Sequence, residues 1–370
     1  MTPAAPTVLH VETGMHLYGG ALQVFYLLRG LAEAGWRNVL VCSEGSAIAE
    51  AAAGFVARVH AVPMSGDLDI KFIGRLRDII RDEAPDLVHL HSRRGADVLG
   101  GIAARLEKVP VVLSRRVDNP EPRWVARLKY RLFDQIVTIS EGIRNVLLRE
   151  GVPPAKVVCV HSAVDAERYR PGGDRAWFDR EFGLASDDQA VGMVAQLIPR
   201  KGHRYLINVV PRILQACPSA RFLLFGKGPL EAELREQIVA AGLQDQVRLA
   251  GFRNDLDRIL PCLDLLVHPA EMEGLGVSLL QAAASGVPLV GTAAGGIPEI
   301  VRDGQTGLLI PPADEAALAD AVIVLLRDRE RARAMGRAGR DLVEREFSIP
   351  AMVEGNMEVY QALLARVRRT

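Results

Sequence analysis

The sequence has few cysteines and no excess of either charge. Its four cysteines, in a chain of 370 residues, are far apart and form no short pairs. This spacing argues against a disulfide framework and against a zinc site, and it fits a reducing, cytoplasmic compartment. Lys plus Arg (45) equals Asp plus Glu (45), so the net charge is zero. Such a balance argues against a general electrostatic affinity for nucleic acid.

A signal peptide and a membrane-spanning segment are also missing from the pattern. The N-terminus has no basic stretch followed by an apolar core. One uncharged run, residues 274–298, is long enough to span a bilayer, but it contains six glycines and Pro288. We interpret it as a buried helix followed by a strand. With 49% apolar and 24% charged residues, the chain is typical of a soluble globular protein, and its length predicts about two domains.

Short β-branched runs alternate with amphipathic helical segments in both halves of the chain. The runs are "TVLHVE", "NVLVCS", "DLVHLH", "PVVLSR" and "QIVTIS", then "AVGMVA", "RFLLFG", "VRLAG", "DLLVHP" and "VPLVGT". Strands separated by helices predict parallel βαβ units, whose ligands bind at the carboxyl edge of the sheet. We therefore expect an α/β protein with two Rossmann-like domains, residues 1–168 and 187–346. A proline- and glycine-rich linker at 169–186 would join them, and a last helix at 347–370 would cross back to the first domain.

Two glycines and two histidines stand out in the first half. Gly19 and Gly20 directly precede a helix, where glycine lets the backbone approach an anion, although an ordinary turn explains them equally well. His89 and His91, two apart on a predicted strand, face one side. No acidic third ligand is identifiable, so we do not interpret them as a metal site. We interpret His89 as a core residue and His91, at the strand end, as a site candidate.

Loops that follow strands in the second half carry positive charge or glycine. Arg200 and Lys201 precede Gly202 and a helix, and fixed charge beside free amides is what a phosphate needs. Cations are mildly unfavourable at a helix start, which favours a functional role for them. The loops "FGKGP" and "AGFRND" end strands at the same edge, where backbone and an aromatic ring suit a nucleobase. Their donor-binding candidates are Gly226, Phe252 and Arg253.

A glutamate beside two glycines precedes an uncharged helix in "EMEGLGVSLLQAAASG". Glu273 can accept hydrogen bonds from hydroxyls, whereas it is a poor helix N-cap compared with Asp, Asn, Ser or Thr. We expect residues 274–277 to form the first helical turn, whose free amides suit a phosphate. Gln281 lies on the same side as Val277. The combination predicts a sugar joined to a phosphate, bound by Glu273, Gln281, Gly274, Leu275, Gly276 and Val277.

The stretch "EGLGVSLLQAAASGVPLVGTAAGGIPEIVRDGQTGLLIPPAD" closely resembles the donor-binding segment of family-4 glycosyltransferases (glycosyl transferases group 1), retaining enzymes of the GT-B fold. "AQLIPRKGH" and "FGKGPLEAELREQIVAAGLQDQVRLAGF" match well, and "HLYGGALQVFYLLRGLAEAG" matches more loosely. The resemblance covers nearly the whole chain and implies two domains that face each other across a cleft. It also implies that Glu273 contacts sugar hydroxyls. The family's second glutamate, which contacts the nucleotide ribose, falls at Gln281.

This sequence departs from the family pattern in three places. Gln281 keeps an acceptor oxygen but lacks the charge of the family's glutamate. Gln196 stands where the family usually has an arginine, so Lys201, helped by Arg200, is the matched cation. Arginines, Arg115 and Arg116, replace the histidine that often lies near the reacting sugar. Arg116 and His91 are therefore both candidates for that contact.

A basic segment, "SRRVDNPEPRWVARLKYRLFD", follows the strand that ends at Arg115. Six basic residues are interleaved there with Trp124, Leu128 and other apolar side chains. Two interpretations remain open: a phosphate-bearing or lipid-linked acceptor near a membrane surface, or a solvated helix face.

We therefore expect a glycosyltransferase that moves a sugar from a UDP- or GDP-type nucleotide sugar to a glycan or lipid-linked acceptor with retention. The resemblance implies a role in bacterial lipopolysaccharide or surface polysaccharide synthesis, without a cofactor or metal. Charge on the leaving diphosphate would be stabilised by Lys201, Arg200, the amides of residues 274–277 and the Gly19–Gly20 loop. We expect peripheral contact with the cytoplasmic face of the inner membrane and no nucleic-acid partner. The alternatives are a nucleotide-sugar epimerase of the same architecture and a degenerate nucleotide-sugar-binding protein.

Overall fold

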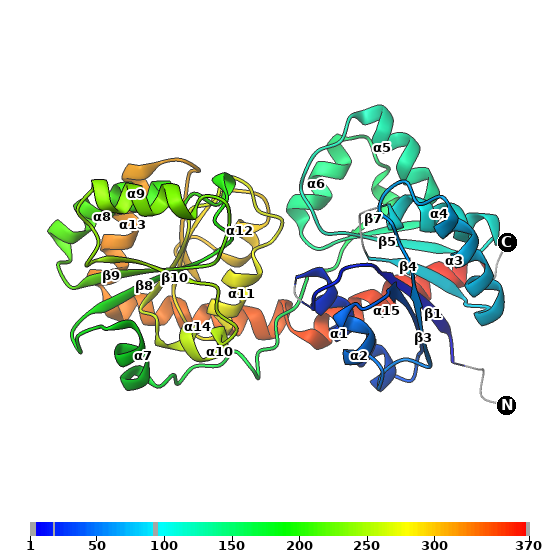
Figure 1. Cartoon of the computed structure of the whole chain (residues 1–370), viewed down its shortest axis with the longest axis horizontal. Coiled ribbons are helices and arrows are strands. Elements are labelled where there is room, and N and C mark those ends of the chain that lie inside the picture. The colour runs from blue at the N-terminus through cyan, green and yellow to red at the C-terminus, as the bar shows by residue number, and fades with distance from the viewer. Residues whose placement is uncertain (1–4, 18, 92–94, 368–370) are drawn as a thin grey trace. The chain divides into compact units, whose positions relative to one another are not determined.

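The chain folds into two compact α/β units (Figure 1). The structure is a computed structural model that describes residues 5–17, 19–91 and 95–367. Unit 1 comprises Met1–Ala163 and Ile349–Thr370, and unit 2 comprises Val164–Ser348. Each unit is built on one parallel sheet, as the alternation of strands and helices predicted.

Unit 1 has a seven-stranded sheet in the order β3-β2-β1-β4-β5-β6-β7. Its strands are β1 (Thr7–Glu12), β2 (Arg37–Ser43), β3 (Arg58–Val62), β4 (Leu87–Leu90), β5 (Val111–Arg115), β6 (Gln135–Thr138) and β7 (Val157–Cys159). The helices are α1 (Gly20–Glu33), α2 (Ala47–Ala51), α3 (Lys71–Glu83), α4 (Ala96–Leu106), α5 (Arg123–Lys129), α6 (Glu141–Arg149) and α15 (Ile349–Val367). Helices α3 and α4 pack together, and α1 packs against α15. Their apolar sides form separate buried clusters with the strands.

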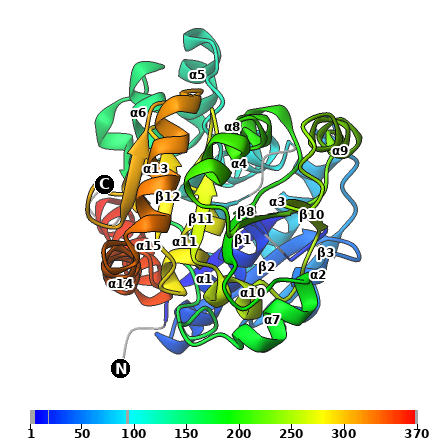
Figure 2. The ribbon, with the colours of Figure 1, turned by 90° about the vertical axis from the view of Figure 1, so that its left-hand side faces the viewer.

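Unit 2 has a six-stranded sheet in the order β10-β9-β8-β11-β12-β13. Its strands are β8 (Gln189–Val194), β9 (Ala220–Phe225), β10 (Val247–Gly251), β11 (Leu265–His268), β12 (Leu289–Thr292) and β13 (Gly307–Ile310). The helices are α7 (Arg175–Phe182), α8 (His203–Ala216), α9 (Glu231–Ala240), α10 (Leu256–Ile259), α11 (Val277–Ala284), α12 (Ile297–Ile300), α13 (Glu315–Arg327) and α14 (Arg329–Glu346). Figure 2 shows α8 and α13 side by side, and with α9 they bury the largest apolar cluster of the unit. Helix α11 packs against α14.

The C-terminal helix returns to the first unit, as predicted. A methyl group on Gly30 of α1 would lie 2.4 Å from a side-chain carbon of Val353 of α15, so the two helices touch where glycine leaves room. Tyr360 of α15 is fully buried, and its hydroxyl lies 2.5 Å from His89 Nδ1 of β4. The helix is therefore part of the core of unit 1.

The segment expected as a linker, residues 169–186, belongs to unit 2 and contains α7. Arg175 of this helix donates hydrogen bonds to the carbonyl oxygens of Cys262 (3.0 Å) and Asp188 (2.7 Å). Phe178 and Phe182 are buried. The proline and glycines before the helix interrupt the βαβ pattern, but the two phenylalanines bury enough apolar surface to hold the segment on the domain.

In both sheets the order in which successive strands are added reverses at an equivalent position. In unit 1 β1 lies beside β4, and in unit 2 β8 lies beside β11, so the following connections run to opposite sides. Ligands of open parallel sheets bind at the carboxyl ends of the two strands at such a switch point. The candidate residues of each unit are therefore sought there.

Two expectations from composition can also be checked. All four cysteines lie in the described part of the chain, and each is a free thiol. Among the described residues, no helix combines the length and the apolar character needed to cross a bilayer.

Candidate active site

The loops at the carboxyl edge of the unit 2 sheet are joined by backbone hydrogen bonds. These bonds run from Leu197 N to Lys227 O (3.1 Å), from Glu271 N to Arg200 O (2.9 Å) and from Gly296 N to Glu273 O (3.1 Å). A methyl group on Gly202 (φ 76°) would lie 2.0 Å from the carbonyl oxygen of Pro269. The loops after β8 and β11 therefore meet over the switch point, at a distance that only glycine permits.

The Glu273 carboxylate joins the charged groups at this switch point. Its Oε2 atom lies 2.5 Å from Lys201 Nζ and 2.8 Å from His268 Nε2, and its Oε1 accepts a hydrogen bond from Gly274 N at 3.2 Å. Burial alone would raise the pKa of Glu273, but the hydrogen bond from His268 and the charge of Lys201 outweigh it and lower the pKa to about 2. Glu273 is therefore a carboxylate at neutral pH, and it lies next to Lys201, the cation that we expect to bind a phosphate.

Two histidines beside this pair were not identified from the sequence. His268, the last residue of β11, is 1% exposed, and its Nδ1 has no hydrogen-bond partner within the described residues. His203, the first residue of α8, is also 1% exposed and has no partner for either ring nitrogen there. Burial, followed by His268 and Lys201, lowers the pKa of His203 to about 4. Only the position of His268 at the end of a strand could have indicated its role.

Helix α11 begins later than we predicted. It starts at Val277, with Gly276 (φ 96°) as the residue before it, rather than at Gly274. The left-handed conformation of Gly276 places residues 274–276 in a loop instead of a first helical turn. The amides of Val277 and Ser278 donate no hydrogen bond to any described residue, so they remain suited to an anion. The side chain of Leu275 is buried and can offer only its backbone.

Gln281 is held by the start of unit 2. Its Nε2 donates a hydrogen bond to the Tyr169 hydroxyl at 3.0 Å, while its Oε1 accepts none from the described residues. The amide side chain is half-buried. Gln281 thus presents one acceptor oxygen, while one of the two N–H donors of its amide is bonded to Tyr169.

The remaining donor-binding candidates of unit 2 differ in their surroundings. Gly226 (φ 145°) lets the loop after β9 approach Ala195 O, which a methyl group would meet at 1.9 Å. Phe252 is exposed, and Lys227 Nζ lies 5.1 Å from its ring centre. Arg253 is occupied by ion pairs with Asp255 (2.7 Å) and Glu181 (2.6 Å), which makes it a poor ligand for a further anion. Gln196 and Arg200 are exposed.

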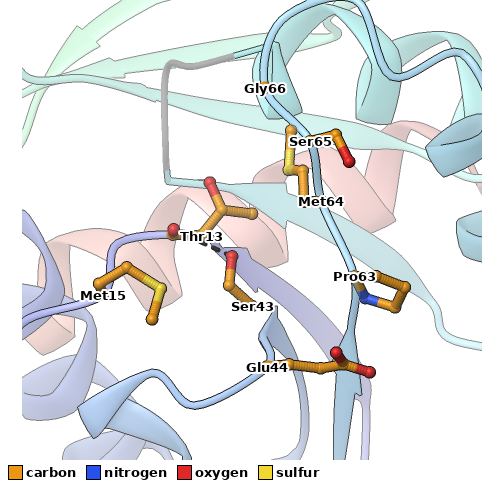
Figure 3. Close-up of a pocket in the computed structure, with 8 residues that line it drawn as sticks. All are labelled: Thr13, Met15, Ser43, Glu44, Pro63, Met64, Ser65 and Gly66. Atoms are coloured by element: carbon orange, nitrogen blue, oxygen red, sulfur yellow. Dashed lines mark hydrogen bonds between the residues drawn. The ribbon is translucent and has the colours of Figure 1, made fainter.

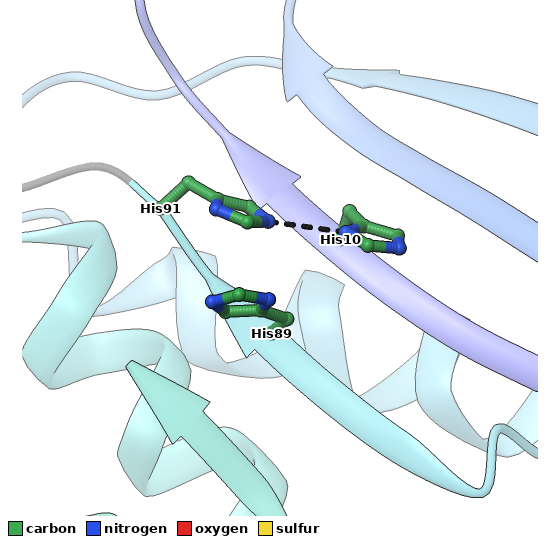
Figure 4. Close-up of side chains that lie close together, drawn as sticks. All are labelled: His10, His89 and His91. Atoms are coloured by element: carbon green, nitrogen blue, oxygen red, sulfur yellow. Dashed lines mark hydrogen bonds between the residues drawn. The ribbon is translucent and has the colours of Figure 1, made fainter. Parts of the chain in front are cut away.

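In unit 1, His91 belongs to a group of three buried histidines at the switch point between β1 and β4 (Figure 4). Its Nε2 lies 3.0 Å from His10 Nδ1, and the two rings are stacked. His89 is held by the Tyr360 and Ser114 hydroxyls at 2.5 and 2.9 Å, as a satisfied core residue. Burial lowers the pKa of all three histidines, to about 3 for His10. They are neutral at physiological pH.

The third histidine, His10, also bears on our argument against a metal. We had found no acidic third ligand, but the neighbouring strand supplies a histidine, and one ring nitrogen of each residue lies within 4.8 Å of the others. Such a set could hold a metal ion. The positive charge of Arg116, however, contributes to the lowered pKa of His89 and His91, and the same charge opposes a cation. The group therefore fits a neutral hydrogen-bonded network better.

Of the two arginines that end β5, Arg116 lies beside the glycine loop. A methyl group on Gly20 would be 3.3 Å from Arg116 Cδ, and Arg116 Nη1 lies 3.4 Å from Ser162 Oγ. Burial lowers the pKa of Arg116 to about 10, against the effect of the nearby Glu12, so the side chain stays charged. Arg115 donates instead to Asn119 O at 2.6 Å and is a structural residue. The structure thus brings Arg116 to Gly20, while Gly19 (φ 54°) forms the start of α1.

Comparisons with known proteins were consistent with this geometry. The model of "Glycosyl transferases group 1" matches residues 174–342, and that of "Glycosyltransferase Family 4" matches residues 18–168. The chain belongs to this family. Together the two matches include the Lys201–Glu273 pair in unit 2 and the Gly20–Arg116 contact in unit 1.

Two sequence relatives and one solved structure resemble this chain over most of its length. The lipopolysaccharide core biosynthesis mannosyltransferase LpsB of Rhizobium meliloti (strain 1021) is 28% identical over 304 residues, 78% of this chain and 85% of that protein. An α-D-kanosaminyltransferase of Streptomyces kanamyceticus is 26% identical over 285 residues, 75% of this chain and 71% of that protein. The structure of Anabaena Alr3699/HepE in complex with UDP aligns with a TM-score of 0.85 at 19% identity, over 96% of this chain and 100% of that one. The Anabaena structure thus shares the fold, and the names of the two relatives refer to different transferred sugars.

The structure shows where the three residues that depart from the family pattern lie. Gln281, where the resemblance implied a glutamate, donates a hydrogen bond to the Tyr169 hydroxyl. Gln196 is exposed on the loop before Lys201. Arg116 lies against Gly20 in the glycine loop of unit 1.

Proposed function

We propose that this protein transfers a sugar, with retention of anomeric configuration, from a nucleotide-diphosphate sugar bound by unit 2 to a glycan or lipid-linked acceptor bound by unit 1. The observation that carries the proposal is the Lys201–Glu273–His268 cluster at the switch point of unit 2. A carboxylate for sugar hydroxyls, a cation for a phosphate and unused amides at the start of α11 stand on adjoining loops.

The cluster suggests how charge is handled during transfer. As the bond between the sugar C1 atom and the diphosphate oxygen breaks, negative charge grows on the diphosphate. Lys201, Arg200 and the amides of Val277 and Ser278 stabilise that charge. The acceptor oxygen bonds to C1 on the same face, and its proton passes to the released phosphate oxygen. Glu273 keeps the sugar in place through its hydroxyls, so no side chain has to act as a general base.

Lys201 changes partners on donor binding in this scheme. In the structure it is paired with Glu273 and is only 9% exposed. A diphosphate offers stronger, multiply charged oxygens and draws Lys201 towards itself. His268 then remains as the donor that holds the Glu273 carboxylate in orientation.

The relatives and the surface of unit 1 support a proposed setting for this activity. The name of the Rhizobium relative refers to the lipopolysaccharide core, which supports a bacterial surface-glycan acceptor for this chain too. On α5, Trp124 and Leu128 are 74% and 65% exposed. Arg123, Arg127 and Arg131 are exposed around them. Apolar side chains between arginines suit the cytoplasmic surface of an anionic membrane, where a lipid-linked acceptor is available.

The transfer proposal is tested with a panel of UDP-, GDP- and ADP-sugars in the presence of candidate glycan acceptors. Release of nucleotide diphosphate with a new α-linked product from an α-linked donor supports the proposal. Conversion of the donor sugar without transfer would indicate an epimerase, and binding without turnover would indicate a degenerate binding protein. Each of these results would overturn it. We expect activity to survive chelation of divalent metals, and a requirement for added metal would contradict that part of the proposal.

Membrane contact is tested separately by sedimentation with phosphatidylglycerol vesicles. Leu128→Ala and Trp124→Ala should each reduce the bound fraction. Val239→Ala, which removes a similarly exposed apolar side chain from α9, serves as the control. Equal binding by all four proteins would assign α5 to an ordinary solvated surface.

A further inference from the structure

A pocket of about 360 Å³ opens at the carboxyl ends of β1, β2 and β3 in unit 1. Figure 3 shows that its walls come from the three loops that follow these strands. The lining residues are Thr13, Met15, Ser43, Glu44, Pro63, Met64, Ser65 and Gly66. Its volume lies near the lower end of the range of about 300–1,000 Å³ that is typical of small-molecule sites.

The pocket shares its first wall with the candidate site of unit 1. Thr13 directly follows Glu12, the last residue of β1. The same connection leads on to Gly19 and Gly20, which lies against Arg116. A molecule seated in the pocket is therefore at the ligand-binding edge of the sheet, one loop away from the residues that the family resemblance assigns to the reaction.

The lining has the chemistry of a carbohydrate subsite. Three hydroxyl-bearing residues, Thr13, Ser43 and Ser65, surround the space together with the thioether side chains of Met15 and Met64. Ser43 Oγ already donates to Thr13 O at 3.1 Å, which leaves its lone pairs as acceptors. Adaptable apolar methionines beside hydroxyls suit the mixed faces of a sugar or cyclitol ring.

The charge of the pocket is the feature that selects among acceptors. Glu44 is exposed and makes no ion pair with any described residue. Among the residues that the structure describes, no lysine, arginine or histidine lines the space. A phosphate or carboxylate on the ligand would meet the like charge of Glu44, whereas an ammonium or hydroxyl group would be attracted. The exposed arginines of α5 follow β5, which is two strands away from β1 in the sheet.

We propose that this pocket holds the acceptor through a polyhydroxylated ring that is uncharged or bears an amine, and that Glu44 selects against phosphorylated rings. The inference rests on the proposed function, because it assigns an acceptor class to that activity. It also separates two roles that the sequence had joined. The basic segment around α5 serves the membrane surface, and the pocket at β1–β3 serves the ring.

The test is a ligand-observed NMR titration of the full-length protein with glucosamine, glucose and glucose 6-phosphate. We expect affinity to decrease in that order. Glu44→Gln should lower the affinity for glucosamine by about fivefold, the size typical of a favourable exposed ion pair, and leave that for glucose unchanged. Glu44→Lys should make glucose 6-phosphate the sugar with the highest affinity. Glu50→Gln, which removes an equal charge from α2 without touching the pocket, should leave the order unchanged.

A second variant tests the location independently of charge. Ser65 lines the pocket and is exposed, so Ser65→Trp can fill the space without entering the core. Binding of all three sugars should then be lost while the melting temperature stays near that of the wild type. Tightest binding of glucose 6-phosphate by the wild type, or binding that is indifferent to both Glu44→Gln and Ser65→Trp, would overturn the proposal.

A nucleotide readout separates this proposal from the function on which it rests. Binding of UDP and GDP, measured by calorimetry, should be unaffected by every pocket variant, because unit 2 carries that site. If the wild type binds neither UDP nor GDP, the proposed function is contradicted. The order of affinities for the three sugars would still test the pocket.

Discussion

The two units share the order of their first six strands, with one further strand in unit 1, but they place different chemistry at the switch point. In unit 1 the position between β1 and β4 holds three neutral histidines, with a charged Arg116 nearby. In unit 2 the position between β8 and β11 holds the Lys201–Glu273 ion pair and its His268 donor. A common architecture thus supports two different kinds of site.

The difference indicates which unit can bind an anion by rearranging charge. In unit 2, Lys201 is paired with the Glu273 carboxylate. This carboxylate can accept hydrogen bonds from sugar hydroxyls instead, so a diphosphate can replace it as the partner of Lys201. The histidines of unit 1 are held neutral by burial and contribute hydrogen bonds rather than charge. The described lining of the pocket in unit 1 includes the Glu44 carboxylate. This difference supports our proposal that unit 2 binds the donor and unit 1 an acceptor ring.

The largest expected effect comes from Glu273. Glu273→Gln should lower turnover by about a hundredfold, because the charged acceptor for the sugar hydroxyls is lost. Affinity for the bare nucleotide diphosphate should stay the same or rise, since Lys201 no longer has a competing carboxylate. Glu271→Gln, two residues earlier on the same loop, is the matched control. Parallel losses of turnover and of nucleotide affinity in Glu273→Gln would mean that Glu273 does not contact the sugar.

Lys201 should dominate nucleotide binding. Lys201→Met removes a charge-assisted contact of about 1.5–3 kcal/mol, so calorimetry should show nucleotide diphosphate affinity reduced about ten- to a hundredfold. Lys71→Met, on the surface of unit 1, should leave it unchanged. If Lys201→Met binds as tightly as the wild type, the anion site lies elsewhere in unit 2.

The buried histidines predict that acid affects the two units unequally. The pKa of His10 in unit 1 is lowered to about 3 and that of His203 in unit 2 to about 4, both below the unfolded value of about 6.5. Below about pH 6.5 the unfolded chain binds protons that the folded chain excludes, so stability falls as the pH falls, until the folded pKa is reached. Each such histidine contributes a slope of up to about 1.4 kcal/mol per pH unit in this window.

Unit 1 should therefore lose more stability in acid, since it contains His10, His89 and His91. Denaturant unfolding at about pH 7 and about pH 5 measures this loss, followed by fluorescence in each unit. His10→Gln should reduce the pH dependence, whereas His16→Gln, at an exposed position, should not. The same slope in His10→Gln and the wild type would show that His10 is not excluded from protonation in the folded state.

Gln281 should have the smallest effect. A glutamine can accept from one ribose hydroxyl through Oε1 while its Nε2 stays bonded to Tyr169. Gln281→Ala should therefore cost about 1 kcal/mol of nucleotide affinity, and Gln281→Glu should keep or improve it. Tyr169→Phe distinguishes orientation from direct contact, because it removes only the partner of Nε2. A folded Gln281→Glu protein that no longer binds nucleotide would exclude the ribose assignment.

Much of the fold could be read from local patterns. The runs "TVLHVE" and "DLVHLH" predicted strands within a residue or two of β1 and β4, because central parallel strands are apolar on both sides. Edge strands β3, β7 and β13 are not among the predicted strands, since Arg58–Val62 is half exposed and both Val157–Cys159 and Gly307–Ile310 are short. Helix α7 was taken for a linker because its burial depends on Phe178 and Phe182, whose partners lie far away in the sequence.

By itself the sequence determined which residues of the candidate site carry charge and which strand ends they follow. Glu273 and Lys201 could be identified because βαβ order places successive strand ends at one edge of a sheet. Only the tertiary structure decided that these two residues form a pair, since they are 72 positions apart and meet through the side-by-side packing of β8 and β11. It likewise decided the roles of His10, His203 and His268. The ionisation and hydrogen bonding of a histidine depend on burial and on neighbours from other strands, and neither is encoded in the residues next to it.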